Sequence, residues 1–378
     1  MIKETKRPAW LEIDLSNLAY NLKSIREKVG PAPDIIGVVK ANGYGHGAYE
    51  ITRALQKNGV KTFGVATLPE AIELREKGID DEIITFGLIP DMFADAVTEY
   101  NISPVTCSYQ NALAISEEAK KYGKTIHGYI KIDTGMGRIG IQHDSPDAVS
   151  EVGKITALDN FKVKGLFSHF ATSDDADTTY TKEQEKRFSA FQDKLRAKGI
   201  NINYRSLANS GAIMQHPTSY YEAVRPGIIL YGYYPCDDSD RTQISIKPLM
   251  SVKAAIVFIK KVAPGNSISY GRRFITDRES LIASITLGYA DGFPRPYSPN
   301  AKAIVGGKIV RIAGNICMDQ CMIDVTDVPN VKVGDEVILM GSDGKNTISV
   351  DDLSRATGTI CNEIVCAFGQ RLPRIYNE

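Results

Sequence analysis

The sequence predicts an α/β protein with a (β/α)8 barrel over residues 1–240 and a mostly-β domain over residues 241–378. Short β-rich runs alternate with amphipathic helical stretches through the first two thirds of the chain. Eight strand–helix units in about 240 residues favour a closed barrel over a doubly wound open sheet. After about residue 235 the pattern changes to alternating, β-branched segments separated by turn signals, which indicates a second domain.

The first element expected is an amphipathic helix over 15–28. Its apolar residues recur at helical spacing and comprise Leu15, Leu18, Leu22 and Ile25. Ser16 lies where its side chain can cap the N-terminus of this helix. The barrel strands, with helices between them, are then expected at 35–40, 62–67, 82–87, 104–107, 126–133, 163–169, 205–209 and 222–225.

A polar, turn-like stretch over 236–248 is expected to link the two domains. Beyond it, turn signals such as APGN and VGD separate the runs that predict strands. These strands are expected at 250–262, 280–286, 301–305, 309–312, 322–325 and 336–339, and a short helix is expected around 350–358.

Composition narrows the possible partners. Lys+Arg and Asp+Glu both total 45, and this balance argues against nucleic acid or an anionic membrane as a partner. No apolar run approaches the length that spans a bilayer, and no export signal is evident. The six cysteines are dispersed, which indicates reduced thiols and a cytoplasmic protein. Cys317 and Cys321 lack the spacing of a zinc knuckle, so no metal is expected.

Reactive side chains follow several of the predicted strands. Catalytic groups of a (β/α)8 barrel gather at the carboxyl ends of its strands, so these side chains are candidates for one site. They are Lys40 after the first strand, Arg138 after the fifth, His169 at the sixth, Asn209 and Ser210 at the seventh, and Arg225 at the eighth.

Lys40 has two interpretations. A lysine at the tip of an apolar strand is usually a solvated strand end. It can also be a lysine that binds an aldehyde cofactor covalently, where burial and nearby cations lower its pKa. Both interpretations remain open on spacing alone.

Nine short motifs carry a family resemblance, in order along nearly the whole chain: VVKANGYGHG, DTGMGRIG, FSHFA, ANSG, VRPGI, SYG, GYADG, CMDQ and RLPR. Together they resemble the motifs of alanine racemases. The resemblance implies a barrel that carries pyridoxal 5'-phosphate, a β domain, and a homodimer in which both subunits contribute to each active site. It implies interconversion of L- and D-alanine, a small-molecule substrate, with D-alanine supplied for peptidoglycan.

By this resemblance, Lys40 binds the cofactor and acts as one of two proton-transfer bases. Tyr270, supplied by the partner subunit, is the other. Racemisation removes a proton from one face of Cα and returns one to the opposite face, which two opposed bases accomplish directly. On its own, a tyrosine in a β-rich domain is most often structural.

The resemblance also assigns cofactor contacts. Arg225 is expected at the pyridine nitrogen, where a permanently charged guanidinium does not readily give up a proton, and His169 is expected beside the ring. Without the motifs, each also fits a structural role at a strand end. The phosphate contacts implied are Tyr44, Asn209, Ser210 and the backbone amides of Gly227 and Ile228.

Substrate contacts are implied in both domains. Arg138 and the backbone amide of Met318 are expected at the substrate carboxylate. Asp319 accompanies Met318, and Tyr289 is expected to narrow the entrance. Lys131 matches a position that is often carbamylated in the family, although an ordinary ammonium is an open alternative.

Two positions depart from the family pattern. Gly43 stands where alanine is usual, which could loosen the turn after Lys40. Gln370 stands where some relatives place a tyrosine near the phosphate, which puts that contact in doubt.

Three other functions compete with alanine racemisation. A serine or broad-specificity racemase needs few changes, because a pocket discriminates one methylene by only ~1–3 kcal/mol. A non-catalytic cofactor-carrying barrel is typically a barrel alone. A decarboxylase usually has a triple-glycine loop and a carboxylate at the pyridine nitrogen, whereas this sequence has no such loop and has Arg225.

Overall fold

The computed structural model describes residues 6–378 and divides them into two compact units. The barrel unit comprises Ala19–Gly43 and Ala48–Ile246. The β unit comprises the described residues up to Leu18, Tyr44–Gly47 and Lys247–Glu378. Across residues 6–378, no helix combines the length and apolar character needed to cross a membrane.

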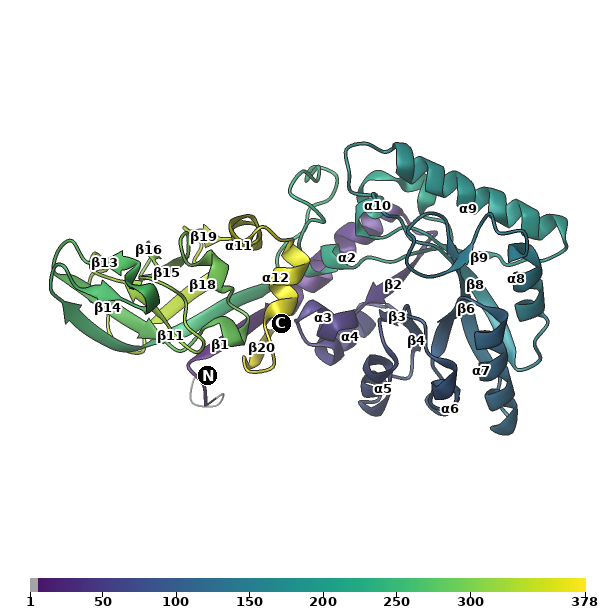
Figure 1. Ribbon diagram of the computed structural model, residues 1–378, viewed down its shortest axis with the longest axis horizontal. Helices are drawn as coiled ribbons and strands as arrows, with labels where there is room; N and C mark the ends of the chain where they lie inside the picture. Colours follow the sequence, from purple (N-terminus) through teal and green to yellow (C-terminus); the bar gives the residue numbers. More distant parts are fainter. Residues whose placement is uncertain (1–5) are drawn as a thin grey trace. The chain divides into compact units, whose positions relative to one another are not determined.

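Eight parallel strands close the barrel, which confirms the predicted fold class (Figure 1). Each strand pairs with the next around the barrel, and the last pairs with the first, since Ala223 lies opposite Asp34. The strands are β2 (Asp34–Val38), β3 (Thr62–Val65), β4 (Glu82–Thr85), β5 (Ser103–Thr106), β6 (Ile126–Asp133), β8 (Phe161–Phe167), β9 (Tyr204–Ser206) and β10 (Ala223–Val224). A short strand β7 (Ile141–Gln142) also pairs with β6.

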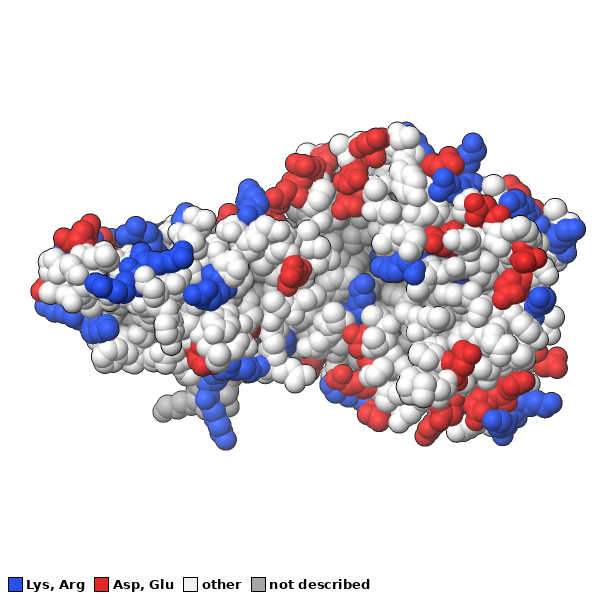
Figure 2. Space-filling view, in the orientation of Figure 1, with Lys and Arg blue, Asp and Glu red and all other residues white. Residues whose placement is uncertain are grey.

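Helices follow the strands of the barrel, as the alternating sequence pattern predicts. They are α4 (Ala48–Lys57), α5 (Leu68–Glu76), α6 (Ala94–Glu99), α7 (Tyr109–Lys121), α8 (Ala148–Thr156), α9 (Thr179–Ala197) and α10 (Ser210–Gln215), with short turns η1 (Asp91–Phe93), η2 (Pro217–Ser219) and η3 (Ile228–Tyr231). On the visible face of the barrel unit, acidic and basic side chains are mixed (Figure 2), in keeping with the balanced composition.

Helix α2 (Leu15–Val29) matches the first helix expected, but its capping residue differs. The side chain of Asp14 accepts hydrogen bonds from the Asn17 backbone amide at 3.0 Å and from the Ser16 hydroxyl at 2.6 Å. The prediction that Ser16 caps the helix is therefore wrong. An acceptor one residue outside the helix reaches the free backbone amides, and Ser16 donates to it instead.

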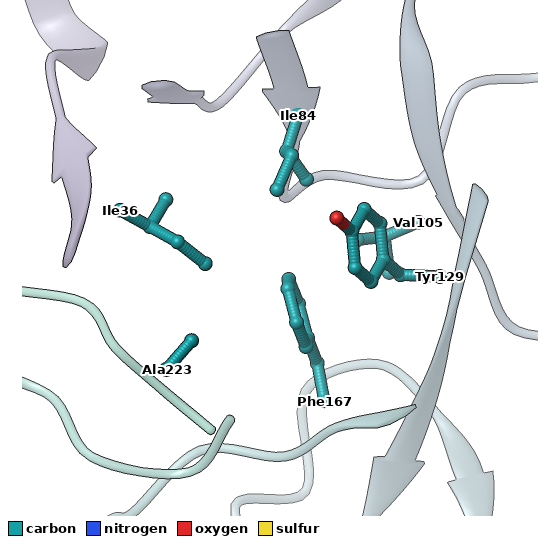
Figure 3. Packing of buried hydrophobic residues seen from close by; sticks show 6 residues of the cluster. All are labelled: Ile36, Ile84, Val105, Tyr129, Phe167 and Ala223. Carbon is teal, nitrogen blue, oxygen red and sulfur yellow. The ribbon is translucent and has the colours of Figure 1, made fainter. Parts of the chain in front are cut away.

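Apolar side chains from six strands fill the barrel interior (Figure 3). The rings of Tyr129 and Phe167 stack with centroids 4.4 Å apart, and both are fully buried. The Tyr129 hydroxyl donates to Glu82 at 2.9 Å, so its polar end is satisfied. The cluster consists of Ile36, Ile84, Val105, Tyr129, Phe167 and Ala223. This packed interior leaves the carboxyl ends of the strands as the place for a site.

The β unit is built around the long strand β11 (Met250–Val262). Strand β1 (Ala9–Asp14) pairs antiparallel with β11 and parallel with β20 (Arg374–Asn377), so the first strand of the chain lies in this unit. The other strands are β12 (Ser267–Ile268), β13 (Phe274–Ile275), β14 (Ser280–Ile285), β15 (Lys302–Val305), β16 (Lys308–Arg311), β17 (Cys321–Asp324), β18 (Glu336–Ser342) and β19 (Thr347–Ile348). Helices α11 (Val350–Thr357) and α12 (Cys361–Ala367) and the turns η4 (Tyr270–Arg272), η5 (Tyr289–Asp291) and η6 (Arg295–Tyr297) complete it.

The barrel interior gives a first prediction. Phe167→Ala removes a fully buried ring and leaves a cavity, so the free energy of unfolding falls by ~3–5 kcal/mol. Urea unfolding followed by circular dichroism measures the loss. Tyr122→Ala is the control, because that side chain is 46% exposed and its removal changes the free energy by less than ~1 kcal/mol. Equal losses in the two variants would contradict the assignment of Phe167 to the core.

Candidate active site

The chain makes an unusual turn directly after Lys40 at the carboxyl end of β2. Ala41, Asn42 and Gly43 all adopt left-handed conformations, with φ between 52° and 60°. The Gly43 amide donates to the Val39 carbonyl at 2.8 Å, which closes the turn. A left-handed conformation costs a non-glycine residue about 1–2 kcal/mol. Lys40 is thus held at the barrel mouth by a strained segment, which is typical of functional sites.

Arg225 occupies the carboxyl end of β10 and is 5% exposed. Its guanidinium donates to the Ser206 hydroxyl at 2.5 Å and to the Ser168 and Leu207 carbonyls at 2.7 and 3.2 Å. It also lies over the Phe167 ring, 5.2 Å from the centroid. Burial lowers the pKa of Arg225 to about 9, so the side chain still carries its charge at neutral pH. Neutral acceptors fix the orientation of this cation.

His169 follows β8 and contacts Arg225. The guanidinium lies 3.2 Å from Nδ1 of His169. Because a guanidinium can only donate, Nδ1 must be the acceptor, and Nε2 carries the proton of the neutral ring. Burial, followed by the charges of Lys131 and Arg225, holds the pKa of His169 well below its usual value. His169 is therefore a neutral imidazole with one fixed tautomer.

Lys131 lies on β6 and is 8% exposed. Burial, followed by the nearby charges of Arg225 and Arg138, lowers the pKa of Lys131 well below that of an exposed lysine. Arg138 itself is exposed, in the loop after β6. The carboxylate of Asp133 shapes this loop by accepting from the Gly135 amide at 2.9 Å. The barrel mouth thus holds a buried amine whose protonated form is disfavoured by burial and by two arginines.

The phosphate-binding residues expected after β9 and β10 lie together. The Gly227 amide donates to the Ser210 hydroxyl at 2.9 Å, which joins the start of α10 to the turn before Ile228 and η3. The side chain of Asn209 accepts from the Ala212 amide at 3.0 Å, so Asn209 caps α10. Hydroxyl and amide donors of this kind suit a phosphate.

The motifs SYG, GYADG and CMDQ converge within the β unit. The Tyr289 amide donates to the Cys317 carbonyl at 3.0 Å, and the next amide donates to the Met318 carbonyl at 3.0 Å. The side chain of Asn315 donates to the Tyr270 carbonyl at 2.7 Å, which ties η4 to the same loop. Tyr270, Met318 and Tyr289 are 70%, 53% and 41% exposed. The loop therefore presents three large side chains on its surface.

Asp291 is the buried anchor of this loop system. Its carboxylate is fully buried and accepts from the Gly288 amide at 3.0 Å. Arg7 and Arg371 bind the same carboxylate at 2.5 and 3.3 Å, and Arg371 also reaches Asp319 at 2.7 Å. Sequence reasoning missed Asn315, Asp291 and Arg7. Their partners lie far away in the chain, up to 284 positions for Arg7 and Asp291, and no local pattern reveals such pairs.

Tyr44 and Gln370 both lie in the β unit. Tyr44 is buried, and this burial raises the pKa of its hydroxyl far above the usual value. Two hydrogen bonds join the segment around Tyr44 to β20: Arg374 donates to the Gly45 carbonyl at 2.8 Å, and Tyr376 donates to the His46 carbonyl at 3.0 Å. Gln370 is exposed in the turn before β20.

The predicted site residues thus form two groups, one in each unit. The barrel unit contains Lys40, Lys131, Arg138, His169, Asn209, Ser210, Arg225, Gly227 and Ile228, and the β unit contains Tyr44, Tyr270, Tyr289, Met318 and Asp319.

These features define the class of protein: a (β/α)8 barrel with a basic site at the carboxyl ends of its strands, joined in one chain to a β unit. The chain matches the alanine racemase N-terminal domain over residues 13–235 and the C-terminal domain over residues 249–376. It therefore belongs to the alanine racemase family.

Individual relatives agree with this assignment. An alanine racemase of Clostridium kluyveri is 47% identical over 370 residues, covering 98% of this chain and 94% of the relative. The structure of an alanine racemase of Clostridium difficile 630 superposes with a TM-score of 0.94 at 38% identity, covering 98% of this chain and 96% of that one. A histidine racemase of Leuconostoc mesenteroides has a TM-score of 0.91 at 30% identity, with 98% of both chains covered.

The buried amine gives a second prediction, on pH dependence. In the folded protein Lys131 loses its proton well below the usual lysine pKa, whereas the unfolded chain keeps it to about pH 10.4. Between these two pKa values the unfolded state binds the extra proton, so stability rises with pH by up to about 1.4 kcal/mol per pH unit. In bicarbonate-free buffer, Lys131→Met is therefore more stable than the parent at neutral pH, and the gap narrows toward about pH 10.

Urea unfolding at several pH values measures this difference. Lys154→Met, at an exposed lysine of α8, is the matched control and shows no pH-dependent gap. A Lys131→Met protein less stable than the parent at every pH would show that the amine is stabilised as an ion.

Proposed function

We propose that the protein interconverts L- and D-alanine with pyridoxal 5'-phosphate as cofactor, and so supplies D-alanine for peptidoglycan. The observation that carries this proposal is the basic site at the barrel mouth, in a chain of the alanine racemase family. Lys40 follows β2 and lies close enough to His169 to lower the pKa of that ring. A primary amine beside a buried arginine suits an anionic aldehyde.

The residues present fit the cofactor. The Ser210 hydroxyl and the amides of Gly227 and Ile228 would hold the phosphate, Arg225 would contact the ring nitrogen, and Lys40 would bind the aldehyde carbon. When bound, pyridoxal phosphate withdraws electrons from Cα of an attached amino acid and makes its hydrogen acidic.

Arg225 limits this electron withdrawal. Its guanidinium stays charged and does not readily pass a proton to the ring nitrogen, and its donors are fixed by Ser206 and two carbonyls. A weaker electron sink suits a reaction that only removes and returns a proton. The arrangement favours racemisation over decarboxylation.

Two bases would exchange the proton at Cα. The Lys40 amine would serve one face and the Tyr270 hydroxyl, contributed by a second copy of the chain in a homodimer, the other. The 70% exposure of Tyr270 supports this role, because a side chain that projects from its own chain can reach a partner. Arg138 and the Met318 amide would hold the substrate carboxylate, with Asp319 and Tyr289 beside them.

Lys131 would act as a carbamate. The uncharged form of its amine, which the lowered pKa favours, would attack carbon dioxide: a C–N bond forms, a C–O π bond becomes an oxyanion, and the surplus N–H proton passes to solvent. The resulting anion would lie near Arg138 and Arg225, which already influence this amine. The carbamate would then orient Arg138 toward the substrate. Native mass spectrometry of protein kept in bicarbonate buffer would reveal the added mass of one carbon dioxide per chain.

A serine or broad-specificity racemase is the second candidate. The histidine racemase of Leuconostoc mesenteroides, with a TM-score of 0.91, supports it by combining this architecture with a different named substrate. Turnover measured side by side on alanine, serine and histidine separates the candidates, and faster serine turnover would replace the primary proposal.

The two-base scheme gives a third prediction. Racemisation has an equilibrium constant of one, so kcat/KM stays equal in both directions in every variant. Exchange of the Cα hydrogen with deuterated solvent therefore identifies each base. Tyr270→Phe racemises ~10²–10⁴-fold more slowly but still exchanges Cα of one enantiomer through Lys40. Chiral chromatography and proton NMR measure the two rates.

Controls sharpen this test. Lys40→Ala is expected to lose both racemisation and the cofactor absorbance band. Tyr122→Phe, at an exposed tyrosine of the barrel unit, retains both rates. Normal racemisation by Tyr270→Phe would remove Tyr270 from the mechanism.

Shared sites give a fourth prediction. When Lys40→Ala and Tyr270→Phe chains are mixed and allowed to exchange subunits, each hybrid dimer contains one site with both bases intact. Activity therefore appears on mixing two nearly inactive proteins. Mixing each variant with itself is the control. Hybrids that form, by tagged co-purification, yet remain inactive would show that both bases come from one chain.

A further inference from the structure

The left-handed turn after Lys40 needs an external support. Ala41 has φ 52° and ψ 50°, and Asn42 has φ 53° and ψ 48°. Side chains other than glycine keep such conformations only where the surrounding structure enforces them. The Asn42 side chain accepts from the Ala48 amide at 3.0 Å, which secures the later part of the turn. The amide of Ala41, the residue directly after Lys40, is secured from another element.

That element is α5, through Glu70. One carboxylate oxygen of Glu70 accepts from the Ala41 amide at 2.7 Å. The other oxygen accepts from the amides of Ala66 and Thr67 at 2.7 and 3.1 Å, at the end of β3 and the start of α5. The side chain is half-buried at the third position of α5. A single carboxylate therefore clamps the chain after β2 to the chain after β3.

The clamp requires a carboxylate. Both oxygens of Glu70 act as acceptors, and each faces backbone N–H groups. Glutamine has nearly the same shape but only one acceptor oxygen, so its amide nitrogen would point a donor at a donor. Glu70→Gln thus breaks one side of the clamp without removing side-chain volume.

We propose that Glu70 is a positioning residue for Lys40: by holding the Ala41 amide, it maintains the left-handed turn and directs the Lys40 amine into the barrel mouth. This inference rests on the proposed role of Lys40 as the cofactor-binding lysine. Glu70 does not touch the reacting atoms. Its effect passes through one backbone hydrogen bond to the residue next to Lys40.

The test compares wild type with Glu70→Gln and with Asp352→Asn. Asp352 is the matched control, because it holds the same third position of α11 and accepts from the Ser349 amide at 2.8 Å. Each variant replaces the carboxylate of a capping residue with an amide whose one oxygen can still cap the helix, but only Glu70→Gln sets an N–H donor against the Ala41 amide and so loosens the turn. Cofactor-free protein is mixed with pyridoxal phosphate and covalent capture is followed by stopped-flow absorbance. Alanine kcat and KM and the pH dependence of the absorbance band are then measured.

We expect Glu70→Gln to slow capture and lower kcat by ~10–100-fold with KM for alanine unchanged, because misplacement of a reacting group costs factors of this size. The pH midpoint of the band shifts as well. Asp352→Asn leaves the capture rate, kcat, KM and the pH midpoint unchanged. Thermal unfolding checks that both variants fold.

Rescue separates positioning from capping. Glycine adopts left-handed conformations at no steric cost, so Ala41→Gly removes part of the need for the clamp. Adding Ala41→Gly to Glu70→Gln is expected to restore much of the capture rate. No rescue, or a Glu70→Gln protein that behaves like Asp352→Asn, overturns the inference. Should wild type itself fail to capture pyridoxal phosphate through Lys40, the proposed function fails first.

Discussion

The burial of several basic side chains at the barrel mouth is the constraint on which the rest of the site depends. A buried charge is costly unless it is compensated, so closely spaced buried basic groups disfavour one another's protonation. Arg225 keeps its charge because carbonyl and hydroxyl acceptors surround its guanidinium. Burial and neighbouring charges lower the pKa of both Lys131 and His169 and so disfavour their protonated forms. The mouth therefore combines one buried guanidinium with two groups whose protonated forms are disfavoured.

This arrangement supports the proposed binding of an anionic, electron-withdrawing cofactor. A guanidinium whose orientation is fixed by neutral acceptors is preorganised, so binding need not reorient it. A lysine whose pKa is lowered gives up its proton more readily and is then nucleophilic, which an exposed ammonium is not. In the β unit, a single buried carboxylate, that of Asp291, binds two arginines and a backbone amide. These contacts fix the loop that carries Tyr289 and Met318.

Much of the barrel could be predicted from local sequence, because parallel strands buried on both faces read as short apolar runs between helices. Strand β6 has the bounds expected, whereas β9 and β10 are shorter than expected, because the chain leaves the sheet at their carboxyl ends to build the site. Strand β1 lies in the β unit, and its partners in β11 and β20 are set by long-range pairing that no local pattern encodes.

The candidate site shows the same division. Lys40, His169 and Arg225 could be found from their positions after predicted strands, and the family motifs supplied Tyr270 and Met318. Glu70 and Asp291 could not, because each acts on backbone amides, and a carboxylate that binds an amide leaves no sequence signature apart from ordinary helix capping. Residues that support the site through hydrogen bonds to the backbone therefore become evident only in the three-dimensional structure.

The covalent target of the cofactor is the most direct measure of this account. Protein incubated with pyridoxal phosphate is reduced with borohydride, digested and mapped by mass spectrometry. The account predicts one pyridoxyl group per chain, on Lys40, and none on the exposed lysines. A label on other lysines with Lys40 unmodified, or no label on protein that still racemises alanine, would contradict it.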